Sequence, residues 1–154
     1  MRGEVSVRAA VAADLEAMRA VAEACAGAPG WGEAVWRGVV GGVDARAGFV
    51  AEVRGEVVGF VVVGCAAGVA EIESVAVVGS ARRRGVGRVL CLAAMEWARG
   101  VGATTMELEV RAGSEAALGL YRSLGFVEQG RRRGYYREPV EDAVLMALKT
   151  GSRK

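Results

Sequence analysis

The alternation of apolar and polar residues along the chain predicts short strands and amphipathic helices in a definite order. Alternating or β-branched runs predict strands at 4–8, 49–53, 57–65, 71–78, 104–111, 126–130 and 143–148. Apolar residues three and four positions apart predict helices at 14–26, 31–40, 85–99 and 114–124. This order indicates an α/β sandwich with a mixed, largely antiparallel sheet and helices on both faces.

Local signals mark several boundaries of these elements. Ala28-Pro29-Gly30 should break the first helix, and Arg54-Gly55-Glu56 should join two strands as a hairpin. Ser114 is expected to cap the last helix at its start, and Gly125 to follow its end as the C′ residue.

The length and composition indicate one globular domain, expected at residues 1–150, with a frayed tail at 151–154. The hydrophobic fraction is 53% and the charged fraction 25%, which is not the composition of a disordered chain. The apolar run 57–70 is too short to span a membrane, and residues 1–8 lack the apolar region of a secretory signal. We therefore expect a cytoplasmic protein without membrane association, as a monomer or weak dimer. The net charge of +2 does not predict direct nucleic-acid binding.

The inventory of reactive side chains excludes several classes of chemistry. The chain contains no histidine, which excludes a histidine general base, a Ser-His triad and histidine-ligated metal sites. Cys25, Cys65 and Cys91 are odd in number and widely spaced, which argues against a disulfide framework and a zinc cluster. We expect no metal, and acid–base work must come from Glu, Asp, Tyr, Cys or a terminal amine.

A glycine-rich segment at 81–90 joins a predicted strand to a predicted helix and is a candidate anion site. Backbone N–H groups at a helix start favour phosphate, and Gly85 and Gly87 allow a close approach to the backbone. A Rossmann fingerprint would need glycine where Leu90 stands, and a P-loop would need a lysine that this segment lacks. The alternative interpretation is a tight turn with solvated arginines.

Several motifs resemble the GNAT superfamily of acetyl-CoA-dependent N-acetyltransferases. Val75-Ala76-Val77 followed by Arg82-Arg83-Arg84-Gly85-Val86-Gly87 is similar to the superfamily's strand and its Arg/Gln-x-x-Gly-x-Gly/Ala signature. Four further segments resemble the RimI family of bacterial ribosomal-protein alanine N-acetyltransferases: Leu108-Glu109-Val110-Arg111-Ala112, Leu120-Tyr121-Arg122-Ser123-Leu124-Gly125-Phe126, Gly134-Tyr135-Tyr136 and Glu141-Asp142-Ala143-Val144-Leu145-Met146. The resemblance covers residues 71–148 and is fainter before them, where Pro29-Gly30-Trp31 is similar to the family's Pro-Trp segment.

The resemblance implies binding roles for three groups of residues. The backbone groups that would pair with the pantetheine arm of acetyl-CoA belong to Val75, Ala76 and Val77. The amides that would hold its pyrophosphate belong to Arg83, Arg84, Gly85, Val86, Gly87 and Arg88. The side chains that would border the acceptor are Trp31, Tyr135 and Tyr136. Two positions depart from the family, because Ser114 stands where an Asn usually contacts the cofactor and Gly134 where Asn is common.

The same resemblance makes Glu109 the general base and Tyr121 the general acid. An α-amino group has a pKa of about 7.7 to 8.0, so a useful fraction is already neutral at pH 7, whereas a lysine amine near 10.4 is far less available. A carboxylate suits the easier deprotonation, and a phenol with a pKa of about 10 can protonate the thiolate that leaves. We therefore expect transfer of the acetyl group to the N-terminal amine of a protein with a small first residue, and we expect that protein to be a ribosomal protein.

Other interpretations of these residues stay open. Glu109 could be a solvated residue paired with Arg111, Tyr121 could be a core aromatic residue, and Glu73 is a second candidate base. Cys91 lacks a histidine to activate it, so packing is favoured over a nucleophilic role. The segment 131–133 is interpreted as a solvated, arginine-rich hairpin tip rather than a contact for acidic substrate or RNA phosphate. The alternative functions are acetylation of a small-molecule amine and an inactive acyl-CoA-binding module.

Overall fold

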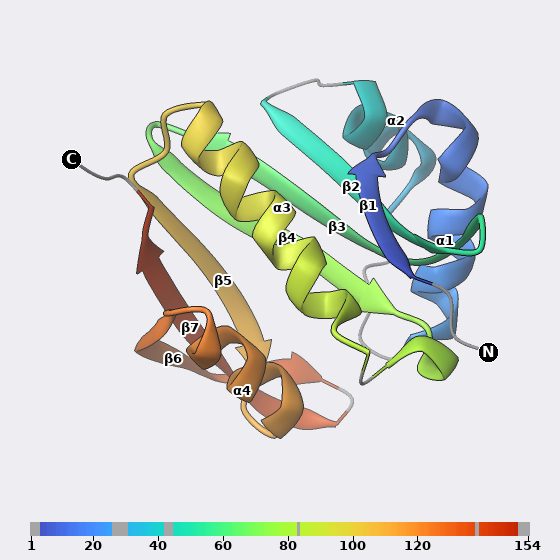
Figure 1. Cartoon of the computed structure of the whole chain (residues 1–154). Coiled ribbons are helices and arrows are strands. Elements are labelled where there is room, and N and C mark those ends of the chain that lie inside the picture. Colours follow the sequence, from blue (N-terminus) through green and yellow to red (C-terminus); the bar gives the residue numbers. More distant parts are fainter. Residues whose placement is uncertain (1–3, 26–30, 42–44, 83, 138, 151–154) are drawn as a thin grey trace.

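The computed structural model describes residues 4–25, 31–41, 45–82, 84–137 and 139–150. Seven strands form one sheet in the order β1-β2-β3-β4-β5-β7-β6 (Figure 1). The strands are β1 (Val5–Ala9), β2 (Arg46–Val53), β3 (Glu56–Ala66), β4 (Val69–Val77), β5 (Thr105–Arg111), β6 (Val127–Arg137) and β7 (Val140–Lys149). The helices are α1 (Leu15–Ala24), α2 (Glu33–Gly41), α3 (Val86–Gly100) and α4 (Glu115–Ser123), with 3-10 turns η1 (Ala12–Asp14) and η2 (Gly79–Ala81). The predicted order and fold class are confirmed, while the predicted helix break at 28–30 and the tail at 151–154 lie outside the described residues.

Helices cover both faces of the sheet because successive side chains of a strand point in opposite directions. On β3, Val61 and Val63 belong to the core beneath α3, while Phe60 and Val62 belong to the core beneath α1 and α2. All four side chains are fully buried. Within the part of the chain described, no helix is both long and apolar enough to cross a membrane.

The junction of β4 and β5 shapes the centre of the molecule. It is a parallel pair in a sheet whose other neighbours are antiparallel. Both strands are described throughout, and they pair from Val69 opposite Thr105 to Glu71 opposite Glu107. Beyond this point they diverge, as Figure 1 shows, towards their C-terminal ends. The C-terminal half of β4 therefore has β3 on one edge and a gap in the sheet on the other.

The arginine-rich segment 131–133 is not a hairpin tip, so that prediction is wrong. It lies inside β6, with Arg131 opposite Val144 and Arg132 opposite Ala143. Pairing with β7 extends both strands well beyond their predicted ends at 130 and 143. Arginines are tolerated here because β6 is an edge strand, whose side chains keep access to water.

Candidate active site

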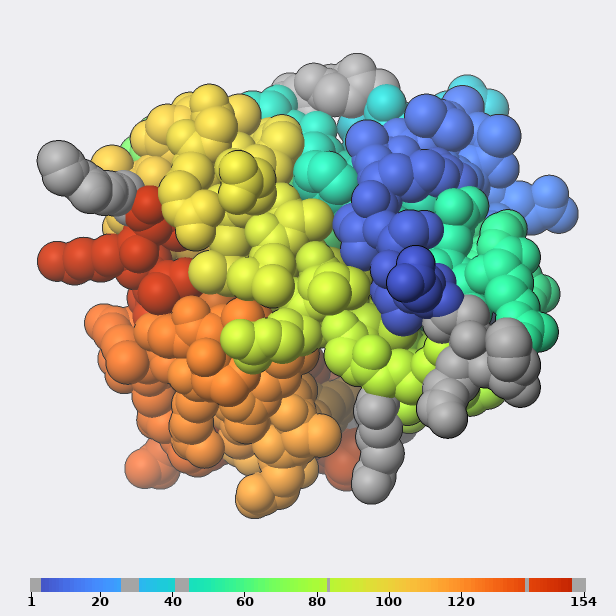
Figure 2. All heavy atoms as spheres, in the orientation of Figure 1, coloured from blue at the N-terminus to red at the C-terminus, as the bar shows by residue number. Residues whose placement is uncertain are grey.

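The gap between the diverging strands opens into a cleft of about 580 Å³. Its lining comes from β4, β5, β6 and α4, together with a residue after α1. The residues named in advance from the sequence that line it are Glu73, Val75, Ala76, Glu109, Ser114, Tyr121, Tyr135 and Tyr136. In Figure 2, the face that carries α3 and α4 is hollowed between the yellow-green atoms at the start of α3 and the orange atoms of α4.

Tyr121 reaches the cleft from α4 and is largely buried. Its side chain is 6% exposed, and its ring packs edge-on against Phe126 at 5.9 Å between centroids. Burial raises the pKa of the Tyr121 hydroxyl above its ordinary value, because a phenolate would lose its hydration there. Tyr121 is thus both a core aromatic residue and a protonated phenol at the wall of the cleft.

Glu109 lies on β5 and forms an ion pair with an arginine from another strand. Its Oε2 lies 3.1 Å from Nε of Arg132 on β6, beyond the intervening strand β7. Arg111 instead makes an ion pair with Glu141 on β7, at 3.1 Å. The alternative interpretation of Glu109 as the partner of Arg111 is therefore wrong.

Two further carboxylates lie beside Glu109 on the cleft side of β4. Burial raises the pKa of Glu71, and the charges of Glu73 and Glu109 add to the effect. Glu73, the second candidate base, is held by Arg46, whose Nε lies 2.8 Å from its Oε1. The Nη2 of Arg46 also donates a hydrogen bond to the other oxygen at 3.1 Å.

At the end of β4, one backbone carbonyl is already hydrogen-bonded by other residues of the chain. The Val77 oxygen accepts a hydrogen bond from Arg82 Nε at 3.0 Å and another from the Cys25 thiol at 3.5 Å. Cys25 lines the cleft, and the sequence offered no signal for this because its neighbour in space is 52 positions away. The edge of β4 that faces the gap therefore comprises chiefly the backbone around Val75 and Ala76.

The candidate anion segment begins α3 immediately after β4 and η2. Gly85 is the N-cap with a φ of 78°, a left-handed conformation that glycine adopts without strain. Within the described residues, no side chain caps this fifteen-residue helix, so its first N–H groups can receive an anion. Gly87 faces α4, where a Cβ would lie 3.3 Å from Leu120 Cδ2. These features fit the pyrophosphate of acetyl-CoA.

The arginines of this segment are placed unevenly. The Arg88 guanidinium donates a hydrogen bond to Ser123 Oγ at 3.0 Å and so connects α3 to α4. Arg83 lies outside the described residues. At α4, Ser114 occupies the predicted N-cap position, but its side chain makes no capping bond among the described residues. Ser114 is one of the residues that line the cleft.

A wall of two tyrosines closes the β6 side of the cleft. Tyr135 and Tyr136 would point to opposite faces of a regular strand, but β6 is irregular between Arg132 and Tyr136, and both line the cleft with ring centroids 5.1 Å apart. Gly134, with a φ of 59°, allows this bend, and its N–H donates to Asp142 Oδ1 at 2.9 Å. The third candidate acceptor residue, Trp31, packs edge-on against Trp36 and is not among the residues lining this cleft.

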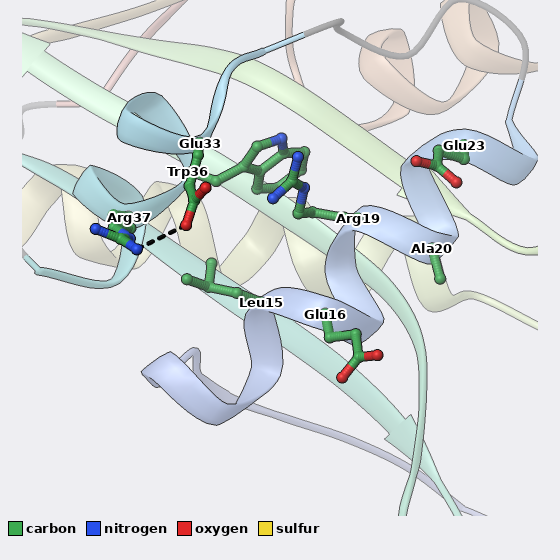
Figure 3. A pocket seen from close by; sticks show the side chains of 8 residues that line it. All are labelled: Leu15, Glu16, Arg19, Ala20, Glu23, Glu33, Trp36 and Arg37. Atoms are coloured by element: carbon green, nitrogen blue, oxygen red, sulfur yellow. Dashed lines mark hydrogen bonds and ion pairs between the residues drawn. The ribbon is translucent and has the colours of Figure 1, made fainter.

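Two other features outside the cleft bear on the candidate chemistry. Cys91 is fully buried, and burial raises the pKa of its thiol to about 12, so its expected packing role is confirmed. A second hollow of about 430 Å³ lies between α1 and α2 (Figure 3). It holds the ion pair of Arg37 with Glu33 and none of the candidate site residues. In the part of the chain that is described, no cluster of three His, Cys, Asp or Glu residues could hold a metal ion.

Comparison with known proteins relates this chain to one family. The model of the acetyltransferase (GNAT) family matches residues 16–126. A [ribosomal protein bS18]-alanine N-acetyltransferase of Salmonella typhimurium is 43% identical over 81 residues, which are 51% of this chain and 55% of that protein. An N-alpha-acetyltransferase of Sulfurisphaera tokodaii is 39% identical over 112 residues, 64% of this chain and 66% of that protein. The chain spans about half the length of the first curated relatives it matches. The crystal structure of the ribosomal-protein-S18-alanine N-acetyltransferase from Escherichia coli is similar with a TM-score of 0.86 and 29% identity, covering 98% of this chain and 97% of that one.

Proposed function

Because the chain belongs to the acetyltransferase (GNAT) family, we propose that it transfers the acetyl group of acetyl-CoA to the N-terminal α-amine of a protein. The acceptor class is suggested by relatives named for the alanine N-terminus of ribosomal protein bS18. We infer a ribosomal protein with a small first residue as the acceptor, which would place the reaction in the cytoplasm.

The observation that carries this proposal is the divergence of β4 from β5. It opens the sheet where the chain has a carboxylate, Glu109, and a phenol, Tyr121, lining one cleft. The start of α3, with its uncapped N–H groups among the described residues, follows the same strand and suits the pyrophosphate. A pantetheine arm could then lie along the free edge of β4 around Val75 and Ala76, as an added strand would.

The proposed reaction is a direct attack with three proton transfers. Glu109 takes a proton from the acceptor ammonium, directly or through a water, and the neutral nitrogen attacks the thioester carbonyl carbon. The bond from carbon to sulfur breaks, and Tyr121 donates its proton to the sulfur. The nitrogen, which still carries one proton too many, passes it to the Tyr121 oxygen, directly or through a water, and this leaves the neutral amide and a protonated Tyr121. Burial raises the pKa of Tyr121, which keeps the phenol protonated and so available as the donor. The charge on the carbonyl oxygen would be stabilised by a backbone N–H at the end of β4.

The experiment that tests this function is acetyl transfer to a matched panel of acceptors. The panel contains peptides with a free N-terminal Ala or Ser, the same peptides with a blocked N-terminus and an internal lysine, and free small amines. Site-resolved mass spectrometry should find label on the α-amine of the first group and little elsewhere.

Each other distribution of the acetyl label leads to a different conclusion. Label chiefly on lysine side chains or only on small amines would refute the N-terminal assignment while leaving the family in place. Binding of acetyl-CoA without transfer to any acceptor in the panel would favour the inactive acyl-CoA-binding module instead.

A further inference from the structure

Arg132 of β6 contacts two side chains that line the cleft, those of Glu109 and Tyr135. Between the pair Arg132 with Ala143 and the pair Tyr136 with Glu141, β6 has more residues than β7. The extra residues turn Arg132 and Tyr135 to the same side, although an odd separation would place them on opposite faces of a regular strand. The Arg132 guanidinium carbon lies 5.0 Å from the centre of the Tyr135 ring.

The same guanidinium is the cationic partner of Glu109. Its Nε lies 3.1 Å from Oε2 of that carboxylate, across the β7 strand that separates β5 from β6. The arginine side chain is 55% exposed and the glutamate side chain 23% exposed. Glu109 is therefore held within the lining of the cleft, whereas the Arg132 guanidinium is open to water and lies over the Tyr135 ring.

Without Arg132, most of the charged groups near Glu109 would be negative. Charged and titratable groups approach it from four elements. These are Glu71 and Glu73 of β4, Glu107 and Arg111 of β5, Tyr136 of β6 and Tyr121 of α4. The strand β7 contributes Leu145 opposite Glu109, which carries no charge. Since Arg111 is engaged by Glu141 and Arg46 by Glu73, Arg132 is the cation paired with Glu109 in the described part of the cleft.

We propose that Arg132 is a positioning residue, which holds the Glu109 carboxylate oriented in the cleft so that it can take the acceptor's proton. This rests on the proposed function, in which Glu109 is the base. The ion pair at 3.1 Å restrains the carboxylate, and the contact with the Tyr135 ring restrains the guanidinium in turn. The partial exposure of Arg132 makes the pair weak enough for an incoming ammonium to approach the same carboxylate.

The first test observes Glu109 without any turnover. Its side-chain carboxyl carbon is followed by NMR in ¹³C-glutamate-labelled protein, with Glu109→Gln to assign the signal. In Arg132→Gln at pH 7 the Glu109 carboxyl signal should shift and broaden, because the carboxylate loses the cation that holds it in one orientation, and Arg132→Lys should restore most of the difference. Arg131→Gln is the matched control, because Arg131 is the adjacent residue of β6 and pairs with Glu128 instead. A Glu109 signal that is the same in Arg132→Gln as in the parent overturns the proposal.

The second test compares turnover at pH 7 on the acceptor that the panel identifies. In Arg132→Gln, kcat should fall about three- to tenfold with KM for acetyl-CoA unchanged, and Arg132→Lys should recover most of the loss. In a Glu109→Gln background, Arg132→Gln should have no further effect. An equal loss in both backgrounds would show that Arg132 acts elsewhere and overturn the proposal.

The two proposals fail in different ways. If the parent protein transfers acetyl to no acceptor, the proposed function fails while the NMR comparison still decides whether Arg132 orients Glu109. If the parent is active and Glu109→Gln is impaired, but Arg132→Gln turns over as fast as the parent, only the role of Arg132 is refuted.

Discussion

Replacing Tyr121 by phenylalanine separates chemistry from packing at the wall of the cleft. The change removes one hydroxyl and keeps the ring that packs edge-on against Phe126. If Tyr121 protonates the leaving thiolate, turnover should fall by roughly 10²- to 10⁴-fold, the range typical of a lost general acid. That loss corresponds to a barrier higher by about 2.7 to 5.4 kcal/mol.

The effect on stability should be much smaller than the effect on the barrier. The Tyr121 side chain is 6% exposed, so the ring remains buried and only the hydroxyl's interactions are exchanged. One such exchange changes the free energy of unfolding by about 0.5 to 1.5 kcal/mol. For a chain of this size, that shifts Tm by roughly 2 to 4 °C for each kcal/mol. A protein with about 5 kcal/mol or more of stability stays almost entirely folded, so unfolding cannot imitate the predicted loss of turnover.

The assay measures acetyl transfer, acetyl-CoA affinity and Tm on the same preparations. Phe126→Leu is the matched control, because it alters the buried ring beside Tyr121 and keeps the hydroxyl. It should lower the free energy of unfolding by about 1 to 2 kcal/mol, and so lower Tm more than Tyr121→Phe does. Its turnover should stay within a few-fold of the parent. Turnover of Tyr121→Phe within a few-fold of the parent would refute the acid role and leave Tyr121 as a packing residue.

The pH profile gives an independent check on the same residue. An acid acts in its protonated form, which persists up to its pKa. Because burial raises that pKa above about 10, activity should show no decline from ionisation of Tyr121 up to about pH 10. A decline centred below pH 9 that is present in the parent and absent from Tyr121→Phe would contradict this reasoning.

Three other perturbations test other parts of the molecule. Acetyl-CoA should raise Tm by several degrees, and Gly87→Asp should abolish the shift by placing a carboxylate at the start of α3; a folded Gly87→Asp protein with the full shift would exclude the anion site. Glu109→Gln should remove most activity near neutral pH and less at high pH, where the amine needs no base, while Glu73→Gln should change it only a few-fold; the reverse ranking would make Glu73 the base. Arg8 holds the pKa of Asp14 below its ordinary value near 3.9, so the pair stabilises the fold above that pH and ceases to do so as pH falls through the lowered value. Asp14→Asn should therefore have a lower Tm than the parent at pH 7. A difference in Tm that did not become smaller towards pH 2 would be evidence against this linkage.

The order of elements could be predicted because its causes are local. The four-residue spacing of Val86, Leu90 and Ala94 marks the buried face of α3, and the period of two in Met106, Leu108 and Val110 marks that of β5. Glycines at 85 and 87 are similarly local, since they mark a close backbone approach at a helix start. These residues predicted the sandwich and the candidate phosphate segment without any tertiary information.

Relations between strands distant in sequence could not be predicted in this way. Nothing in β4 or β5 alone states that they pair at Glu71 and Glu107 and then diverge, because the register depends on what packs on each face. The irregularity of β6 moves Tyr135 to the side of Tyr136, which reverses the side expected from a period of two. Which arginine pairs with which carboxylate was likewise decided by the tertiary structure.

The amino-acid sequence by itself determined which residues could serve as base, acid and phosphate contact, through residue type and the motifs around them. The tertiary structure alone decided which of them share a cleft, that Arg132 rather than Arg111 is the partner of Glu109, and that Tyr121 is buried enough for its pKa to rise. The physical reason is one of range. Helix and strand periodicity act over a few residues, whereas solvation and ion pairing depend on every chain segment that comes within several ångströms.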